Sequence, residues 1–369
     1  MSTEHPSRKT PKYRIVVDFI HDHIRANHLT AGAKLPTEQE LCAMLSVSAD
    51  TVQRAMRRLK EEGTVIRRQG SGCYVADSFY EKAPPSPEKV FHLVIDYENN
   101  PYSGSGKYAE GVRKYFSEKG WKVTVHVSNC ELYSELRHIQ RLKEEGETNI
   151  LLCPVLSEWA FMEYSRLTDE GCRFTFLDRK MLGVSGNLVE TDNAGGIRML
   201  CEHLIGLGHR NILFLDQRPY FFSSTQGRLE GYKTALLAHH LPVREENIII
   251  SWDYMELLRR RLQSPDRPTA VVAVNDDTAV YAIRLAESLG LRVPDDLSVT
   301  GFDGIGLQNT DRHVLTTVVQ PFFDVGYEAA RLFCHRLTRP EERGFCTVTL
   351  PVTLSIGNTT KAPPALPEK

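Results

Sequence analysis

The sequence has no C-x-x-C pair, no long apolar run and no hydrophobic segment near its start. Its eight cysteines are scattered, and several lie in apolar stretches, which is typical of small core residues in a reduced protein. No stretch reaches the length of a membrane-spanning helix, and MSTEHPSRKTPK lacks the apolar core of a signal peptide. These absences exclude a disulfide framework and predict a cytoplasmic protein with no membrane partner.

Motifs for catalysis, cofactors and metals are missing as well. There is no Gly-rich phosphate loop and no nucleophile elbow, and His21 and His23 are not spaced as a metal pair on a helix. Asp178 and Asp303 could in principle flank a glycosidic bond, which keeps a sugar-processing enzyme as a remote alternative. We therefore expect no enzyme, no cofactor and no metal.

Charge is distributed unevenly along a chain of ordinary composition. The 369 residues are 41% hydrophobic and 25% charged, which leaves room for two or three globular domains. Residues 1–76 hold twelve Lys or Arg against eight Asp or Glu, a net +4, so the remainder carries −6 of the overall −2. A basic excess confined to the N-terminal part is the distribution expected for contacts with nucleic-acid phosphates.

The segment Leu35–Asp77 has the pattern of two short helices followed by a hairpin. Thr37 and Glu40 form a capping-box pair, Ser48 can cap a second helix, and Gly63 stands where a left-handed stop is expected. Two short strands, 64–68 and 73–75, flank a Gly-containing turn. A helix-turn-helix with a basic second helix and a basic hairpin fits a DNA major groove. The apolar positions expected to face the core are Leu41, Met44, Leu45, Val52, Ala55, Met56 and Leu59.

This segment, with the helix around 13–27 and the AGAKLP entry before it, resembles the winged-helix domain of the GntR family. Family members usually carry Arg at the positions of Gln39 and Ala49, where arginine reads guanine edges, so the resemblance implies an operator that differs from the usual one. The DNA-binding positions implied are Lys34, Pro36, Thr37, Gln39, Ser48, Ala49, Asp50, Thr51, Gln53, Arg54, Arg68, Gln69, Gly70 and Ser71.

A proline-rich segment separates this head from an α/β body. Residues 78–89 read as an extended linker between a head at 1–77 and a body at 90–369. From Val90 onward, strands that are apolar throughout alternate with amphipathic helices, which indicates parallel sheets covered on both faces. The expected strands are 90–96, 121–127, 149–153, 173–178, 187–191, 211–216, 247–251, 269–276 and 297–303.

Nine such units exceed one doubly wound sheet, so we expect two α/β subdomains with a ligand between them. The motifs HLIGLGHRNILFLD, VVAVNDDTAVYAIRLAESLGLRVPDDLSVTGFDG and LTTVVQPFFDVGYEAARLF resemble the effector domain of the LacI/GalR repressors, which is periplasmic-binding-protein-like. The resemblance places the subdomains at about 90–187 plus 321–347 and 188–320 plus 348–360. A GntR-type head on a LacI-type body resembles the arabinose-responsive type of repressor.

Candidate ligand contacts stand where predicted strands end. Asp178, Asn275 and Asp303 are expected to project into the crevice, and Arg228 supplies a guanidinium. Such groups form paired hydrogen bonds with sugar hydroxyls, and Trp252 offers a flat apolar face. Asp303 could instead serve a turn, Asn275 a helix cap and Trp252 the core. The resemblance adds Tyr102, Ser103, Lys107, Gln320 and Phe322.

These features together predict a transcriptional repressor of carbohydrate genes that a small sugar releases from operator DNA. The resemblance implies a homodimer that places two heads on a pseudo-palindromic site. A regulator activated by a purine-like corepressor remains the alternative, because the sequence does not fix the sign of the response.

Overall fold

The structure, a computed structural model, describes residues 12–27, 29–68, 71–77, 89–98, 103–155, 157, 159–217, 222–305, 313–339 and 344–364. Its contacts divide the chain into two compact units, Met1–Lys89 and Val90–Lys369. Each unit has its own hydrophobic core, so each is described by itself. Among the described residues, no helix is both long and apolar enough to cross a membrane.

The first unit is a three-helix domain with a two-stranded antiparallel hairpin. Its elements are α1 (Lys12–Ala26), α2 (Glu38–Leu45), α3 (Ala49–Glu61), β1 (Val65–Arg68) and β2 (Gly72–Val75). The predicted capping box of Thr37 with Glu40 is confirmed, and the Ser48 side chain accepts from the backbone of Thr51 at the start of α3. Gly63 has φ +75°, the left-handed conformation predicted for the helix stop.

The core of this unit lies between α1, α3 and the hairpin. The predicted apolar face of α3 is buried, while Leu41 is the one fully buried position of the three predicted on α2. Met44 is 60% exposed, so not every apolar position of this helix faces the core.

The second unit contains two parallel sheets. The first sheet has the strand order β13-β7-β6-β5-β3-β4 and the second the order β11-β10-β8-β9. All nine predicted strands are present in these sheets, and their pairings are parallel. They are β3 (Val90–Ile95), β4 (Lys122–Val127), β5 (Asn149–Leu152), β6 (Arg173–Leu177), β7 (Asn187–Thr191), β8 (Ile212–Asp216), β9 (Ile248–Ile250), β10 (Ala270–Ala273) and β11 (Ser298–Thr300).

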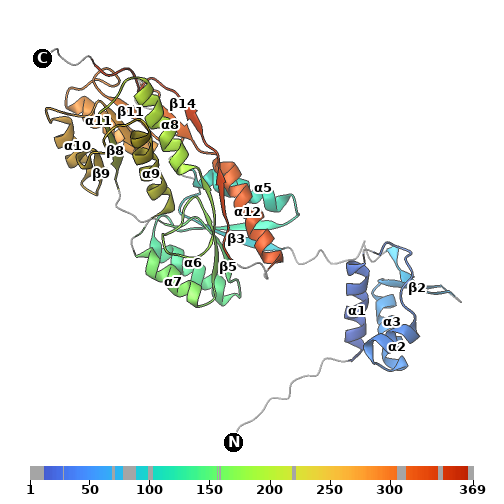
Figure 1. Cartoon of the computed structure of the whole chain (residues 1–369). Coiled ribbons are helices and arrows are strands. Elements are labelled where there is room, and N and C mark those ends of the chain that lie inside the picture. Colours follow the sequence, from blue (N-terminus) through green and yellow to red (C-terminus); the bar gives the residue numbers. More distant parts are fainter. Residues whose placement is uncertain are drawn as a thin grey trace, which may run out of the picture. The chain divides into compact units, whose positions relative to one another are not determined.

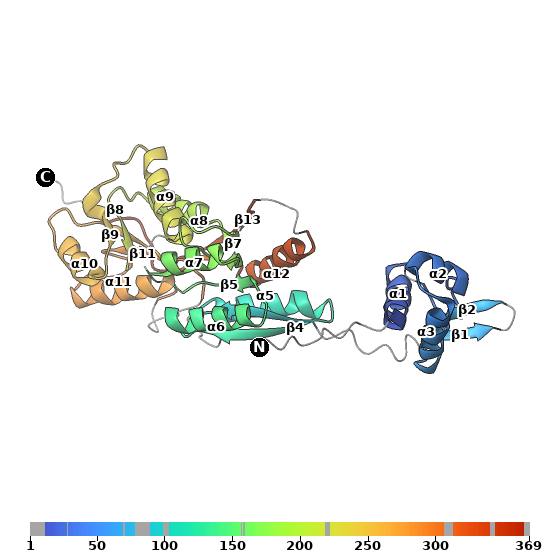
Figure 2. The ribbon, with the colours of Figure 1, turned by 90° about the horizontal axis from the view of Figure 1, so that it is seen from below.

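Helices cover both faces of the first sheet. On one face lie α5 (Ser105–Ser117) and α12 (Phe322–Thr338), which pack side by side (Figures 1 and 2). On the other face lie α6 (Leu132–Glu144) and α7 (Ala160–Asp169). The buried strand residues alternate between these two layers, as a doubly wound sheet requires.

The second sheet is covered in the same way. One face packs on α8 (Asn193–Gly206) and α9 (Ser223–Ala238), and the other on α10 (Tyr254–Leu262) and α11 (Asp276–Ser288). A short 3-10 helix at Glu245–Asn247 precedes β9.

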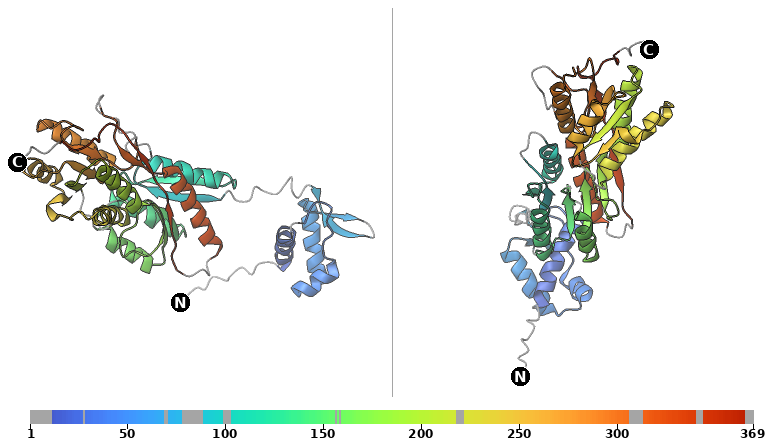
Figure 3. Two further views of the ribbon diagram at one scale, coloured as in Figure 1. Left: turned by 45° about the horizontal axis from the view of Figure 1, so that its top comes forward. Right: turned by 90° about the vertical axis from the view of Figure 1, so that its left-hand side faces the viewer.

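Three segments cross between the subdomains, after residue 191, after residue 319 and after residue 350. Strand β12 (Thr317–Val319) pairs antiparallel with β14 (Thr353–Ser355), and β13 (Thr347–Leu350) pairs parallel with β7. The red end of the chain in Figure 3 follows this return path. Because β7 and β13 both belong to the first sheet, the crossings come after Thr191 and Leu350, a few residues beyond the predicted 187/188 and 347/348.

Candidate functional site

Arg228 on α9 lies at the centre of a buried polar cluster where the strands of the second sheet end. Its Nε donates to Asn193 Oδ1 at 2.8 Å, and a terminal nitrogen donates to the carbonyl of Val274 at 2.7 Å. The other terminal nitrogen lies 3.8 Å from Asp303 Oδ1. The guanidinium carbon lies 3.9 Å from the ring centroid of Phe302, a cation–π contact that fixes the plane of the fork.

Asp303 is held in this cluster by a second set of polar groups. Gln320 Nε2 donates to Asp303 Oδ1 at 2.6 Å, and Thr191 Oγ1 donates to Gln320 Oε1 at 2.8 Å. Burial raises the pKa of the Asp303 carboxyl, while the neighbouring Arg228 lowers it. Asp303 also has φ +134°, a backbone strain of the kind that concentrates at ligand sites. We call Asn193, Arg228, Asp303 and Gln320 the Arg228 cluster.

Asn275 and Asp276 organise the loop beside this cluster. Asn275 Oδ1 accepts from the backbone of Thr278 at 2.9 Å, so the helix-cap role considered for it is confirmed. Asp276 Oδ2 accepts from the backbone of Gly304 and Ile305 at 2.9 and 3.1 Å. The acidic residue therefore fixes the turn after Asp303, and the Asn275 amide nitrogen remains the group that could reach a ligand.

A second polar group lies at the strand ends of the first sheet. Arg179 donates to Asp178 and to Asp96, the latter at 3.3 Å, and its Nε donates to the carbonyl of Pro154 at 3.2 Å. Ser105 at the start of α5 donates to the other oxygen of Asp96. Asp178 has φ +67°, so both predicted strand-end carboxylates carry an unusual backbone. We call Asp96, Asp178 and Arg179 the Asp178 cluster.

Three further predicted positions lie at the start of α5 and α12. Ser103 and Ser105 share a hydrogen bond of 2.8 Å between their hydroxyls, and Lys107 Nζ lies 6.0 Å from the ring centroid of Phe322. A Cβ on Gly104 would stand 2.2 Å from the Phe322 ring, so this position needs glycine. Phe322 is therefore seated against the loop before α5. The predicted Tyr102 lies outside the described residues.

Trp252 is set apart from both clusters. It follows β9, the edge strand of the second sheet, and its residue surface is 61% exposed. This exposure shows that the core role considered for Trp252 is wrong. An exposed indole at the strand ends can still cover a ligand.

Hydrogen bonds link the start of α9 to the loop that carries Asp178 and Arg179. Ser223 at the start of α9 donates to Glu190 at 3.2 Å and accepts from the backbone of Lys180, so the loops of the two subdomains are joined there. Alternating carboxylate, amide and guanidinium groups suit a ligand rich in hydroxyls.

Sequence reasoning missed several members of these networks. Arg179 directly follows the predicted Asp178, and Asn193 lies two residues beyond the end of the predicted strand 187–191, which is the signal that could have identified them. Asp96 ends the first strand and pairs with Arg179 across 83 positions of the chain, a partnership that only the sheet order reveals. Burial raises the pKa of Glu190, beside Ser223, to about 7.

In the first unit, the predicted DNA-binding residues lie on one helix and two loops. Gln53 and Arg54 are exposed on α3, and Ser48 and Thr51 share a hydrogen bond of 2.8 Å between their hydroxyls at its start. The Arg54 guanidinium lies 4.9 Å from the ring centroid of Tyr13, which orients it along α1. Four of the other predicted positions are also exposed: Lys34, Gln39, Ala49 and Asp50.

The hairpin adds a basic tip to this surface. The Arg68 guanidinium lies 4.7 Å from the ring centroid of Tyr74, and Ser71 is exposed at the turn. Thr37 is exposed within its capping box, and Pro36 is half-buried before α2. The predicted Gln69 and Gly70 lie outside the described residues.

Comparison with known protein families supports the resemblance of each of the two units. Residues 12–75 match the model of the bacterial regulatory proteins of the gntR family, and residues 201–360 match that of a periplasmic binding protein-like domain. These two matches fall within the first and the second unit, respectively.

Relatives extend the similarity over nearly the whole chain. The arabinose metabolism transcriptional repressor of Geobacillus stearothermophilus is 27% identical over 95% of this chain and 98% of its own. The ribose operon repressor of Halalkalibacterium halodurans is 27% identical over 85% of this chain and 89% of its own.

A solved structure shares the fold of the second unit. It is a LacI family transcriptional regulator from Enterococcus faecium with bound ribose, 23% identical, with a TM-score of 0.58 over 74% of this chain and 99% of its own. The chain thus combines a GntR-type helix-turn-helix domain with a periplasmic-binding-protein-like domain, and it matches arabinose and ribose operon repressors of GntR- and LacI-like architecture.

Proposed function

We propose that this protein is a transcriptional repressor that binds operator DNA through its first unit and is released from it by a sugar bound in its second unit. The observation that carries the proposal is the Arg228 cluster at the strand ends, in a chain whose relatives are repressors of sugar-metabolism genes. Hydrogen-bond donors and acceptors that are held in fixed orientations suit a polyhydroxylated ligand.

In this proposal the sugar lies between the Arg228 cluster and the Asp178 cluster. Asp303 and Asp178 accept from hydroxyl groups, Arg228 and the Asn275 amide donate to them, and Trp252 covers an apolar face of the ring. Gln320 and Phe322 at a crossing segment, and Tyr102, Ser103 and Lys107 in the loop after the first strand, complete the contacts. The protein binds this ligand without transforming it, so it is not an enzyme.

On DNA, α3 enters the major groove and the hairpin contacts the adjacent backbone. Gln53, Thr51 and Arg54 face the bases or phosphates, and Ala49 offers at most a methyl contact. Two chains pair through their second units in the cytoplasm and place two heads on one operator. Closure of the cleft changes the spacing of the heads, which then no longer matches the half-sites.

Isothermal titration calorimetry of the full chain with L-arabinose, D-ribose and D-glucose tests the ligand class. We expect saturable binding of at least one of these sugars and loss of that binding in Arg228→Ala. Exposed Arg284, on the second unit but outside the site, provides the control Arg284→Ala. Absence of sugar binding alongside saturable binding of a purine such as hypoxanthine would overturn the proposal.

A further inference from the structure

A pocket of about 740 Å³ lies at the end of the first sheet opposite to the proposed sugar site. Its wall is formed where three neighbouring strands begin, at Asn149 of β5, Arg173 of β6 and Asn187 of β7. The proposed sugar contacts stand where strands end, whereas this pocket lies where strands begin. The two sites are therefore at opposite ends of the strands of the parallel sheet. A volume of this size falls in the range that small-molecule ligands occupy.

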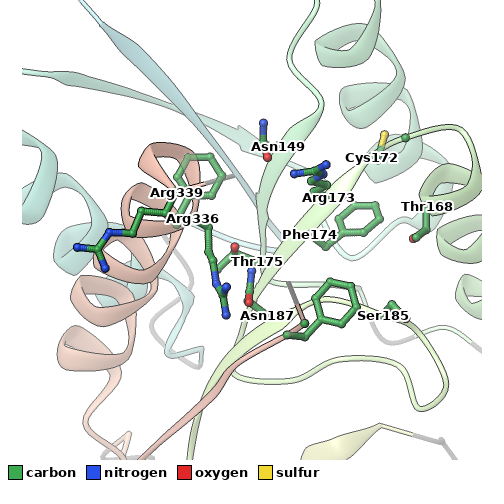
Figure 4. Close-up of a pocket in the computed structure, with 14 residues that line it drawn as sticks. Asn149, Thr168, Cys172, Arg173, Phe174, Thr175, Ser185, Asn187, Arg336 and Arg339 are labelled. Carbon is green, nitrogen blue, oxygen red and sulfur yellow. The ribbon is translucent and has the colours of Figure 1, made fainter. Parts of the chain in front are cut away.

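The charged residues that line this pocket are arginines. Arg173 comes from β6, whereas Arg336 and Arg339 come from the last turn of α12 and its C-cap (Figure 4). No Asp or Glu belongs to the lining among the residues that the structure describes. Figure 4 shows the Arg173 guanidinium beside the strands, while one of the two α12 arginines extends away from them, and Arg339 Nη1 lies 2.9 Å from His335 Nε2. These positive charges favour an anionic ligand, because a planar guanidinium can hold two anionic oxygens.

The helix dipole accounts for only part of this charge. Cationic side chains in the last turn of α12 are favourable because that end of the helix carries partial negative charge, which explains Arg336 and Arg339 as structural residues. Arg173 belongs to a strand of the sheet, so this explanation does not apply to it.

The remaining lining provides hydrogen-bonding groups and an aromatic wall. Figure 4 shows Asn187 beside Thr175 and Ser185, with Asn149 at the start of the neighbouring strand. Asn187 Oδ1 already accepts from the backbone of Cys346 at 3.1 Å, which leaves its amide nitrogen as a donor. Phe345 is 60% exposed at this site and offers a ring against which an uncharged part of a ligand can pack.

We propose that this pocket is a second effector site, which binds a small phosphorylated metabolite through Arg173, Arg336 and Arg339. Strand β3 also begins at this end of the sheet, at Val90, the first residue of the second unit. The proposed ligand therefore binds at the end of the sheet where the second unit begins. A phosphorylated metabolite bound there and a sugar bound at the strand ends occupy separate places and can bind at the same time.

Calorimetric titration of the full chain with sodium pyrophosphate, at constant ionic strength, tests this site. We expect saturable binding that Arg173→Gln and Arg339→Gln each weaken at least about tenfold, because hydrogen bonds to a charged group are lost. Arg284→Gln removes the same charge from an exposed helix position and should leave the affinity unchanged. Arg54→Ala tests the basic head as the source of binding and should also leave it unchanged.

Three results would overturn the proposal. One is the absence of saturable binding, and another is equal affinity in the wild type, Arg173→Gln and Arg339→Gln. The third is loss of binding in Arg54→Ala alone, which would assign the anion to the DNA-binding head. The melting temperatures of both pocket variants should match that of the wild type. If the chain binds pyrophosphate but no sugar, the sugar proposal is wrong and the proposal of a second effector site stands.

Discussion

Asp303 is half-buried, has an unusual backbone angle and contacts two polar side chains, so replacing it tests ligand binding most directly. Replacement by alanine would leave a residue without a side-chain partner at φ +134°, whereas asparagine tolerates positive φ better and keeps the shape. Asp303→Asn is therefore the cleaner variant.

Asp303→Asn should weaken sugar binding at least about tenfold, since a hydroxyl-binding acceptor is lost at a cost of about 1–3 kcal/mol. Affinity for operator DNA should stay within about twofold, because the DNA-binding residues belong to the other unit. The phenotype would be a repressor that sugar no longer releases. Calorimetry with the sugar and fluorescence anisotropy with operator DNA measure the two affinities, and unchanged sugar affinity would show that Asp303 is only a turn residue.

Glu135 on α6 predicts a pH dependence of stability that is independent of any ligand. Its carboxylate accepts from the backbone of Val155 at 2.9 Å and from the Tyr164 hydroxyl, and burial raises its pKa from 4.5 to about 7. Because the folded-state pKa is above the unfolded value, the stabilising contribution of the protonated form is complete below about pH 4.5. It is lost as the pH rises through about 7.

Glu135→Gln cannot ionise, and its single side-chain oxygen can accept from the Val155 backbone while its amide nitrogen donates to the Tyr164 hydroxyl. The wild type should therefore lose thermal stability relative to Glu135→Gln between pH 5 and pH 8, at about 1.4 kcal/mol per unit of pKa shift as an upper limit. Melting temperatures of both proteins across this range give the difference directly. Parallel curves would mean that Glu135 has an ordinary pKa in the folded protein.

At the scale of elements, α3 carries the proposed contact with DNA. Arg54 is exposed on it beside Tyr13, whereas the Arg58 guanidinium on the same helix is 2.5 Å from Glu62. Arg54→Ala should weaken operator binding and lower the slope of log K against log salt by about 0.9, the value for one phosphate contact. Arg58→Ala is the matched control, because its charge is already neutralised, and it should change the slope little.

Anisotropy titrations at 50, 100 and 200 mM salt give these slopes. A slope in Arg54→Ala equal to that of the wild type would show that the Arg54 side chain stays with Tyr13 and makes no phosphate contact.

The sequence predicts the buried strands better than the partly exposed ones. The nine predicted strands are apolar along their length because helices cover both faces of their sheets. Strands β12, β13 and β14 were not predicted, since they are three or four residues long, rich in threonine and partly exposed. They are the crossing and edge strands, whose pairing depends on the return of the chain.

The same distinction holds for the polar clusters. Asp178 and Asp303 could be predicted because each stands at the end of a predicted apolar strand, and the ends of parallel strands lie together. The partners Asp96 and Asn193 could not be assigned, because their contacts with Arg179 and Arg228 depend on which strands and helices become neighbours. The pocket at the strand beginnings left no motif, since its arginines come from separate segments of the chain.

At the scale of the whole molecule, sugar in the second unit must change how the first unit binds DNA. In the proposed mechanism, one subdomain turns against the other around the ligand, at the three segments that cross between them. The ligand can shift DNA binding only by its difference in affinity for the two arrangements, so binding and release must be measured together.

The most direct test selects an operator from random duplex DNA with the full chain and then titrates the complex with the sugar identified by calorimetry. We expect the sugar to weaken operator binding by about tenfold or more in the wild type and not in Asp303→Asn, as measured by fluorescence anisotropy at fixed salt. Operator affinity that is unchanged or increased by the bound sugar would contradict release of the repressor by its ligand.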